Sequence, residues 1–393
     1  MGQPHAVIIG GGIGGLTTAA ALCDRGWAVT VCEREPSPGG ADVGLGLLPN
    51  GLRALDAIGV GDALRAGAAR PDTAVLRRVD GRVLLRLDQE RLSRRYGDAV
   101  VVVARSALVR LLLGRLPATA VHTGVAVTGV ETGDTHQPAR VRTTAGDLSA
   151  DLVVAADGVR STVRGLLFPD HPEPAYAGFT TWRFVAPGPG GPVAAGETWG
   201  RGAAFGLLPL PDGRVYGYAT ANAPAHRRAA DERAELLRLF GDWHGPVPDL
   251  LRAVPPQAVV RADAWVADTP LPAYHRGRVA LVGDAAHAIP PNLDQGACLA
   301  MEDAVVLAHR ASSSAAYLPS ALASYTDDRL GRTSYVVQRI AQFAELARAT
   351  SPVLARGRDA GVRLMGALAP HRSVQRYLDS ILRWQPPRQG ALL

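Results

Sequence analysis

Residues 6–15, AVIIGGGIGG, form the stretch that decides the fold of this chain. The four apolar residues 6–9 predict a buried parallel strand, because parallel strands are covered on both faces and read as continuous hydrophobic runs. Residues 16–25 predict a helix that ends at Gly26, and residues 27–32 predict a second buried strand ending on Glu33 and Arg34. A strand, a turn, a helix and a second strand within about 30 residues predict a βαβ unit.

The turn of this unit contains the spacing GxGxxG, from Gly10 to Gly15. Glycines at these positions allow a tight turn and let backbone N–H groups approach a pyrophosphate at the positive end of the helix. Glu33 follows about 20 residues later at a strand end, where a carboxylate can bind ribose hydroxyls. A merely tight turn is the alternative, but strand, turn, helix, strand and acid together favour the binding of an adenine dinucleotide.

A second motif lies in residues 151–164, DLVVAADGVRSTVR. An apolar strand delivers Asp157 and Gly158, and Ser161 and Arg164 follow on the next turn. Taken alone, this segment fits an ordinary strand end with a capped helix equally well.

A third motif spans residues 277–308, GRVALVGDAAHAIPPNLDQGACLAMEDAVVLA. The strand 279–282 ends on Gly283 and Asp284, and a carboxylate there can hold a polyol hydroxyl. The helix Gln295–Arg310 can point its positive end at a developing negative charge. His287 suits a base by type, but such a histidine is more often packed and hydrogen-bonded, and we expect that structural role.

The overall composition excludes several classes of function. The chain has 393 residues, is 47% hydrophobic and 20% charged, and carries a net charge of +6, with arginine as its only basic residue besides histidine. The arginines are spread along the chain without a basic run interleaved with aromatics, so we expect no nucleic-acid partner. The three cysteines have no metal-binding spacing, and we expect no metal site. Without a signal peptide or a long apolar run, the chain is expected to be cytoplasmic and free of membrane contact.

The pattern of elements predicts an α/β fold with a Rossmann-like FAD-binding domain, an inserted antiparallel-sheet substrate domain and a helical C-terminal region. The FAD-binding domain is expected to be discontinuous, in residues 1–172 and 273–320. Residues 173–272 contain short runs punctuated by Gly and Pro, which predict the antiparallel sheet. Residues 75–87 predict a hairpin, residues 121–130 a strand, and residues 321–393 the helical region.

The three motifs, in this order, resemble the single-component FAD-dependent aromatic hydroxylases, the class A flavoprotein monooxygenases with the para-hydroxybenzoate hydroxylase-like fold. The resemblance covers about residues 5–310 and includes GLGLLPNGLRALDAIGVGDAL (44–64) and VARSALVRLLL (103–113). It implies FAD as the bound cofactor and NADH or NADPH as a transient reductant. It also implies transfer of one oxygen atom from O2 to a small organic substrate, through a flavin hydroperoxide, by a monomer or homodimer.

The resemblance also implies the cofactor-binding residues. Glu33, Arg34 and the glycine turn would hold the ADP half, Arg105, Val125 and Asp284 the middle of FAD, and residues 293–297 the flavin ring. The full set is Gly10, Gly12, Ile13, Gly14, Gly15, Glu33, Arg34, Gly46, Arg105, Val125, Asp157, Gly158, Asp284, Leu293, Asp294, Gln295, Gly296 and Ala297.

Asp294 stands where this family usually has glycine. One interpretation is an N-cap for the helix Gln295–Arg310, since aspartate caps helices well and tolerates unusual backbone angles. The other is an altered flavin environment, because a carboxylate there would oppose the negative charge of a reduced ring. We expect the cap.

Arg183, Tyr216 and Pro291 are the catalytic candidates. Arg183 can pair with an acidic or phenolic substrate, and an exposed strand arginine is its alternative. Tyr216 resembles in position the tyrosine of FAD-dependent urate hydroxylases, but Ala204 stands where those enzymes have an arginine, which argues against urate. Trp182, Phe205 and Leu207 are expected to line an apolar pocket, which favours an aromatic or polyketide-like substrate.

Hydroxylation and epoxidation both fit these features. A flavin-dependent halogenase is an alternative, but those enzymes carry a WxWxIP signature and this chain has no such string. A flavoprotein dehydrogenase that does not insert oxygen is the remaining alternative.

Overall fold

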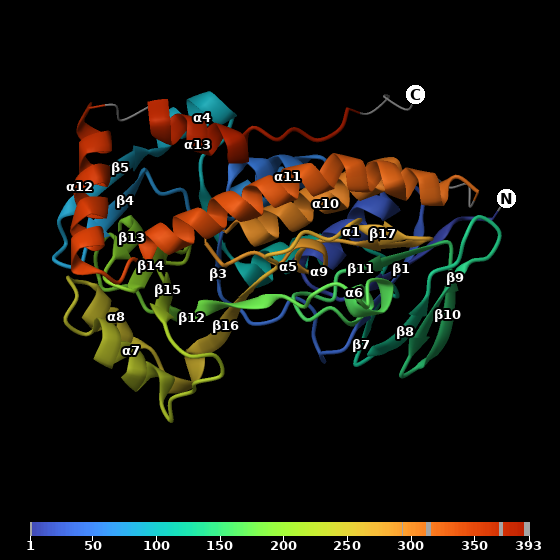
Figure 1. The fold of residues 1–393 in the computed structure, drawn as a ribbon, viewed down its shortest axis with the longest axis horizontal. Coiled ribbons are helices and arrows are strands. Elements are labelled where there is room, and N and C mark those ends of the chain that lie inside the picture. The colour runs from blue at the N-terminus through green and yellow to red at the C-terminus, as the bar shows by residue number, and fades with distance from the viewer. Residues whose placement is uncertain (1, 293, 312–315, 369–371, 389–393) are drawn as a thin grey trace.

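The computed structural model describes residues 2–292, 294–311, 316–368 and 372–388. At its centre lies a six-stranded sheet whose neighbouring strands are parallel except β17 and β18 (Figure 1). In spatial order its strands are β17 (His275–Arg276), β18 (Val279–Leu281), β11 (Leu152–Ala155), β1 (His5–Ile9), β2 (Ala28–Glu33) and β7 (Val121–Thr123). The three separated stretches that predicted one parallel sheet meet here, and the predicted α/β fold is confirmed.

Helix α1 (Ile13–Cys23) begins inside the glycine turn rather than at residue 16. A Cβ at Gly15 would lie 1.9 Å from the carbonyl oxygen of Gly10, and a Cβ at Gly10 would lie 2.4 Å from that of Ala156. The chain can therefore reverse beside β11 only because both residues lack side chains. The turn places the first backbone N–H groups of α1 above the carboxyl ends of the parallel strands.

A seven-stranded sheet forms the second layer. In spatial order its strands are β16 (Val260–Val266), β12 (Ala175–Ala186), β15 (Val215–Asn222), β14 (Ala203–Pro209), β13 (Ala195–Trp199), β4 (Thr73–Arg78) and β5 (Val83–Asp88). Its pairs are antiparallel except β13 with β4. The hairpin of β4 and β5 was predicted, and it extends this sheet although its residues lie outside 173–272.

One face of the second sheet is covered by α7 (Glu232–Phe240) and α8 (Val247–Ala253). Trp182, Phe205 and Leu207 all pack into the apolar core beneath these helices. The prediction that these three residues line the substrate pocket is therefore wrong. Side chains alternate between faces along a strand, and the pocket lies on the opposite face.

Smaller elements complete the core. Residues 121–130 were predicted as one strand but divide into β7 and β8, with Gly124 at φ +70° between them. Two small sheets contain β3 (Gly44–Leu47) with β6 (Val101–Ala104), and β8 (Val127–Glu131) with β9 (Ala139–Thr143) and β10 (Gly146–Ala150). The short helices are α2 (Pro49–Asp56), α3 (Gly61–Ala66), α4 (Gln89–Tyr96), α5 (Arg105–Leu113), α6 (Thr162–Leu167) and α9 (Asp284–His287), and a 3-10 turn lies at Pro256–Ala258.

Four helices end the chain. They are α10 (Gln295–Arg310), α11 (Leu318–Ala347), α12 (Pro352–Leu368) and α13 (Arg372–Leu382). Helices α10 and α11 run side by side across the molecule, and α12 stands beside β4 and β5 at one end (Figure 1). The predicted helical C-terminal region is thus present. In the described part of the chain, no helix is long and apolar enough to cross a membrane.

Candidate active site

A cavity of about 290 Å³ lies between the strand ends of the first sheet, helices α1 and α10, and the open face of the second sheet. It brings together many of the residues that sequence analysis selected. These are Gly12, Ile13, Gly14, Arg105, Gly158, Arg183, Tyr216, Asp284, Pro291, Asp294, Gly296 and Ala297. The motifs that lie far apart in sequence therefore meet at one site.

The dinucleotide end of this cavity is made of backbone. A Cβ at Gly12 or at Gly158 would meet no other heavy atom within 4 Å in the described part of the chain, so the space before both residues is open. Helix α1 begins at this point without a side-chain cap. Its first N–H groups are thus available to an anionic ligand, and the helix dipole favours negative charge there. The cradle fits the pyrophosphate of a dinucleotide.

Glu33 lies at the edge of this cradle. Its carboxylate accepts hydrogen bonds from the backbone N–H of Gly11 at 2.6 Å and of Glu35 at 2.8 Å. The backbone N–H of Val125 donates to the carbonyl oxygen of Glu33, while Arg34 is exposed and pairs with Glu35. Val125 therefore lies beside Glu33 at this end of the site.

In the second motif, hydrogen bonds fix the conformation of the chain at the end of β11. Asp157 accepts hydrogen bonds from the Ser161 hydroxyl at 2.6 Å and from the backbone N–H of Val163 at 3.1 Å. Ser161 also caps α6 by accepting from the backbone N–H of Arg164. The strand end followed by a capped helix is therefore present, and the same segment places Gly158 at the cavity. Burial raises the pKa of Asp157, and its hydrogen bonds to Ser161 and Val163 oppose that rise.

Arg164 ties the second motif to the third. Its guanidinium donates to the carbonyl oxygens of Val159 and Ala285 and pairs with Glu173 at 2.8 Å. The side chain is almost fully buried. The sequence motif thus encodes a clamp that keeps the ends of β11 and β18 together.

Asp284 and Arg105 both line the cavity, and each influences the ionisation of the other. The Asp284 side chain is open to the cavity that it borders. The protein around it excludes bulk water, and this desolvation raises the pKa of its carboxyl. Burial lowers the pKa of Arg105, and the positive charge of Arg183 lowers it further. The Arg105 guanidinium is held in place by the carbonyl oxygen of Gly39. This pair can bind the polar chain of a dinucleotide.

Asp294 precedes α10 with φ +46°, in the left-handed region that aspartate tolerates. Its side chain makes no capping hydrogen bond to α10 and instead accepts from the backbone N–H of Gly46. The expected cap is therefore wrong, because the carboxylate turns toward β3 and the cavity. A Cβ at Gly46 would lie 2.4 Å from the Asp294 carboxylate, which explains glycine at that position. Leu293 lies outside the described residues.

Burial raises the pKa of Asp294 to about 6, and the charge of Arg183 acts against this rise. The uncapped end of α10 carries Gly296 and Ala297, which line the cavity. A carboxylate and a helix N-terminus thus lie together where the resemblance places the flavin ring.

The substrate end of the cavity is made of side chains from one row of the second sheet. Arg183 on β12 pairs in register with Tyr218 on β15, and Tyr218 lies next to Gly206 on β14. A Cβ at Gly206 would lie 1.9 Å from the Tyr218 ring, so glycine lets this ring cross β14. The Tyr218 hydroxyl then donates to Glu197 on β13 at 2.8 Å.

Glu197 was not selected by sequence analysis. Its carboxylate also accepts from the indole N–H of Trp199 at 2.5 Å, and burial raises its pKa. A glutamate two residues before a tryptophan on a short strand carries no signal of its own. Gly206, which pairs with Glu197 on the neighbouring strand β14, could have indicated it only with the register known.

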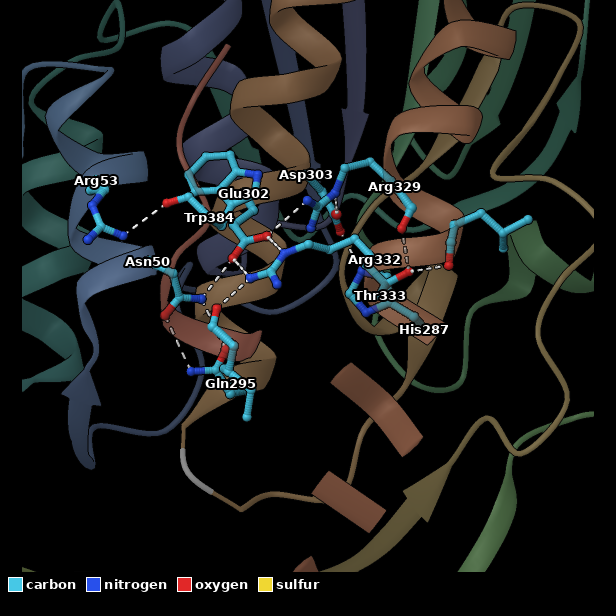
Figure 2. Close-up of polar contacts among 12 residues, drawn as sticks. Asn50, Arg53, His287, Gln295, Glu302, Asp303, Arg329, Arg332, Thr333 and Trp384 are labelled. Atoms are coloured by element: carbon cyan, nitrogen blue, oxygen red, sulfur yellow. Dashed lines mark hydrogen bonds and ion pairs between the residues drawn. The ribbon is translucent and has the colours of Figure 1, made fainter. Parts of the chain in front are cut away.

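A buried polar network links α10 to α11 and α2 (Figure 2). Arg329 on α11 binds Glu302 at 2.9 Å and Asp303 at 2.7 Å, and all three side chains are fully buried. Glu302 also accepts from Asn50 at 2.8 Å, and Asn50 donates to Gln295 at 3.0 Å. Gln295 was expected to contact the flavin, but its side chain is buried in this network instead.

His287 belongs to the same network. Its Nε2 lies 2.6 Å from Asp303, which also accepts from the backbone N–H of Gly283. Although burial opposes ionisation, His287 and Arg329 hold the pKa of Asp303 down to about 2. His287 is 3% exposed. It is the structural residue that sequence analysis expected, and it holds the end of β18 against α10.

Comparison with known proteins agrees with this geometry. The family described as FAD binding domain matches residues 4–340. Aurachin C monooxygenase/isomerase of Stigmatella aurantiaca is 35% identical over 86% of this chain and 89% of its own. The 3-amino-4-hydroxybenzoate 2-monooxygenase of Streptomyces cremeus is 33% identical over 86% of each. The structure of Klebsiella pneumoniae HpxO with FAD and uric acid has a TM-score of 0.86 and 28% identity over 97% of both chains.

The chain belongs to the FAD binding domain family and, within it, to the FAD-dependent monooxygenases. FAD is its cofactor, and the backbone cradle at Gly12 and Gly158 fits the pyrophosphate of this dinucleotide.

Proposed function

We propose that this enzyme inserts one oxygen atom from O2 into an aromatic ring that carries an acidic hydroxyl or carboxyl group, with NADH or NADPH as reductant. The observation that carries the proposal is Arg183. Its guanidinium lines the cavity and makes no hydrogen bond or ion pair to another residue in the part of the chain that the structure describes. A planar guanidinium matches the two oxygens of a carboxylate or a phenolate. The named substrate of the Streptomyces cremeus relative, a hydroxybenzoate, has both groups.

When bound, FAD would pass electrons from NADH or NADPH to O2 and so activate one oxygen atom of O2 for transfer. The residues of the chain position the substrate and manage its protons. Arg183 holds the acidic group, and the Asp294 carboxylate accepts the proton of a ring hydroxyl, which makes the ring more electron-rich. The N-terminus of α10 stabilises negative charge at the flavin end. The Asp284 carboxyl binds the middle part of FAD.

Urate is not favoured as the substrate. Ala204 is buried among Leu84, Trp199 and Val362, so this part of the sheet is apolar. Arg183 is the cation among the polar groups that line the two cavities from the second sheet, which are Thr181, Arg183, Glu197, Tyr216, Tyr218 and Thr220. This set suits one acidic substituent better than a heterocycle with polar atoms on every edge.

The test is substrate-stimulated NADH or NADPH oxidation by the purified holoenzyme, with 18O2 and mass spectrometry of the product. A panel of hydroxybenzoates, phenols and neutral benzene analogues should give stimulation and one 18O atom only with the acidic rings. Arg183→Leu should raise KM for these rings by about tenfold to a hundredfold, the value of a hydrogen bond to a charged group.

The matched control is Arg214→Leu, because Arg214 is exposed and pairs with Asp212 at the outer end of the same sheet. It should leave KM unchanged. Oxidation of the reductant without 18O in the product would contradict oxygen insertion. An unchanged KM in Arg183→Leu would contradict the role of Arg183.

A further inference from the structure

A second cavity, of about 540 Å³, adjoins the reaction cavity, and Tyr218 and Asp294 border both. We call it the tail cavity. Its volume is typical of a small-molecule site, for which the usual range is roughly 300–1,000 Å³. Its walls are mainly aliphatic and aromatic. Of the described residues expected to contact FAD, Asp294 alone borders it.

The floor of the tail cavity is the continuation of the row that begins at Arg183. Residues paired across strands point to the same face of a sheet. In order from β12 to β5, the row is Arg183, Tyr218, Gly206, Glu197, Leu76 and Leu85. The face therefore changes from charged at the ring site to apolar at the far end, over six neighbouring strands.

The roof of the tail cavity comes from the C-terminal helices. Phe343 of α11, Val362 of α12 and Leu378 of α13 face the same space as Leu76 and Leu85. This explains why α12 stands against β4 and β5 (Figure 1). The helical region thus closes an apolar chamber over the end of the sheet.

The tail cavity reaches the surface between α11 and α12. Leu346 and Met365 line it and are 47% and 41% exposed. An apolar chamber of this size costs free energy when its walls face water, and an apolar ligand removes that cost. The tail cavity thus extends from Asp294 and Tyr218 at one end to Leu346 and Met365 at the other.

We propose that the natural substrate is an aromatic ring with a long apolar chain, the ring lying at Arg183 and Asp294 and the chain in the tail cavity. This inference rests on the proposed ring oxygenation for the placement of the ring. The chain itself is assigned by the continuity of the two cavities and by the change of the sheet face from charged to apolar. A compact substrate would leave the walls around Leu76 and Leu85 without an apolar partner.

The test is a homologous series of 4-alkylphenols, from phenol to 4-octylphenol, titrated into the holoenzyme by isothermal titration calorimetry. Each buried methylene should improve Kd by up to about fourfold until the chain fills the cavity. Leu85→Trp narrows the cavity beyond the ring site. It should leave the Kd of phenol unchanged and remove most of the gain for butyl and longer chains.

A second variant guards against a misfolded Leu85→Trp. Met365→Glu places a charge at the mouth and should weaken octylphenol binding at least about tenfold, while phenol binding stays the same. Leu364→Glu is its matched control, since Leu364 is the preceding residue of α12, is 57% exposed and does not line the cavity. Kd values independent of chain length, or a chain-length gain that survives in both variants, would overturn the proposal.

The calorimetry needs no turnover, so the two proposals fail separately. A chain-length gain without 18O incorporation would contradict ring oxygenation and support the tail cavity as an apolar binding site. Oxygenation of phenols with no chain-length gain would contradict the tail cavity alone.

Discussion

The two ends of the active-site cavity are built from different parts of the polypeptide. The dinucleotide end consists of backbone: open glycines at Gly12 and Gly158, strand ends, and a helix that begins without a side-chain cap. The substrate end consists of side chains that come from separate strands, such as Arg183, Tyr218 and Glu197. A backbone site depends on glycine spacing within one segment, whereas a side-chain site depends on how distant segments pair.

Helix α10 is the element that the two ends share. Its N-terminus carries Gly296 and Ala297 toward the flavin end and follows Asp294, which faces the substrate end. The buried pairs of Arg329 with Glu302 and Asp303 hold this helix against α11 (Figure 2). Disturbing them should affect both ends together, while changes within either end should affect that end alone.

The largest effect is expected for Arg329→Leu. The variant leaves Glu302 with Arg332 and Asp303 with His287 as their remaining ionic partners. Removing one partner of a buried ionic cluster costs about 3–5 kcal/mol of unfolding free energy. Urea unfolding of the apoprotein measures this loss. Affinities for FAD and for substrate should both weaken, because α10 loses its support.

The control for that experiment lies on the same helix. Asp328 forms a half-exposed pair with Arg310, so Asp328→Asn should cost less than about 1 kcal/mol. Stable protein with unchanged affinity at both ends after Arg329→Leu would show that the network does not position α10. Arg329→Lys, which keeps the charge, should recover part of the stability.

A smaller effect, confined to the dinucleotide end, is expected for Gly12→Val. Gly12 has φ −74°, so valine can adopt its backbone conformation, but the new side chain enters the open space of the cradle. FAD affinity should fall on the order of a hundredfold, equivalent to two lost backbone hydrogen bonds to phosphate at about 1.5 kcal/mol each. Flavin titration of the apoprotein measures the change.

The melting temperature of that apoprotein should stay within a few degrees of the wild type, and Gly12→Ala should bind FAD with intermediate affinity. Normal flavin content in the valine variant would mean that the phosphates lie elsewhere.

The dinucleotide end could be predicted from sequence because its signals are local. The βαβ unit, Asp157–Gly158 and Gly283–Asp284 each combine a buried strand with a turn residue, and parallel strand ends meet at one sheet edge. Even the hairpin at residues 75–87 was marked by its own Asp80 and Gly81. These features need no knowledge of distant pairing.

The substrate end could be predicted only in part, because its face depends on register. Phe205 was assigned to the pocket although it points to α7, since a one-residue error in alternation inverts every side chain of a strand. Glu197 was missed because only its pairing with Tyr218 reveals it. Asp294 was expected to cap α10, but the close approach of Gly46, which no local pattern encodes, draws its carboxylate away.

The smallest effect is expected at the substrate end, for Asp294→Asn. Asparagine tolerates the left-handed backbone and can still accept from Gly46, so the variant removes only the charge. At pH 8, kcat/KM for a ring with a hydroxyl group should fall roughly tenfold, less than the ~100-fold typical of a general base, because a phenol can also lose its proton to water. A ring without a hydroxyl group should show no change.

The pH dependence of Asp294 distinguishes this chemistry from a change in structure. Because burial raises the pKa of its carboxyl from the ordinary 3.8 to about 6, the proton-accepting form dominates only above that pH. The wild-type kcat/KM should therefore fall as the pH drops below 6, and the variant should lack this limb. For folding, the sign is opposite: the raised pKa stabilises the protein below pH 4, and this contribution is lost as the pH rises through 6. Asp294→Asn should accordingly melt above the wild type at pH 8 and lose that advantage in acid. An acid limb that persists in the variant would assign the proton transfer to another group, with Glu197 the next to test.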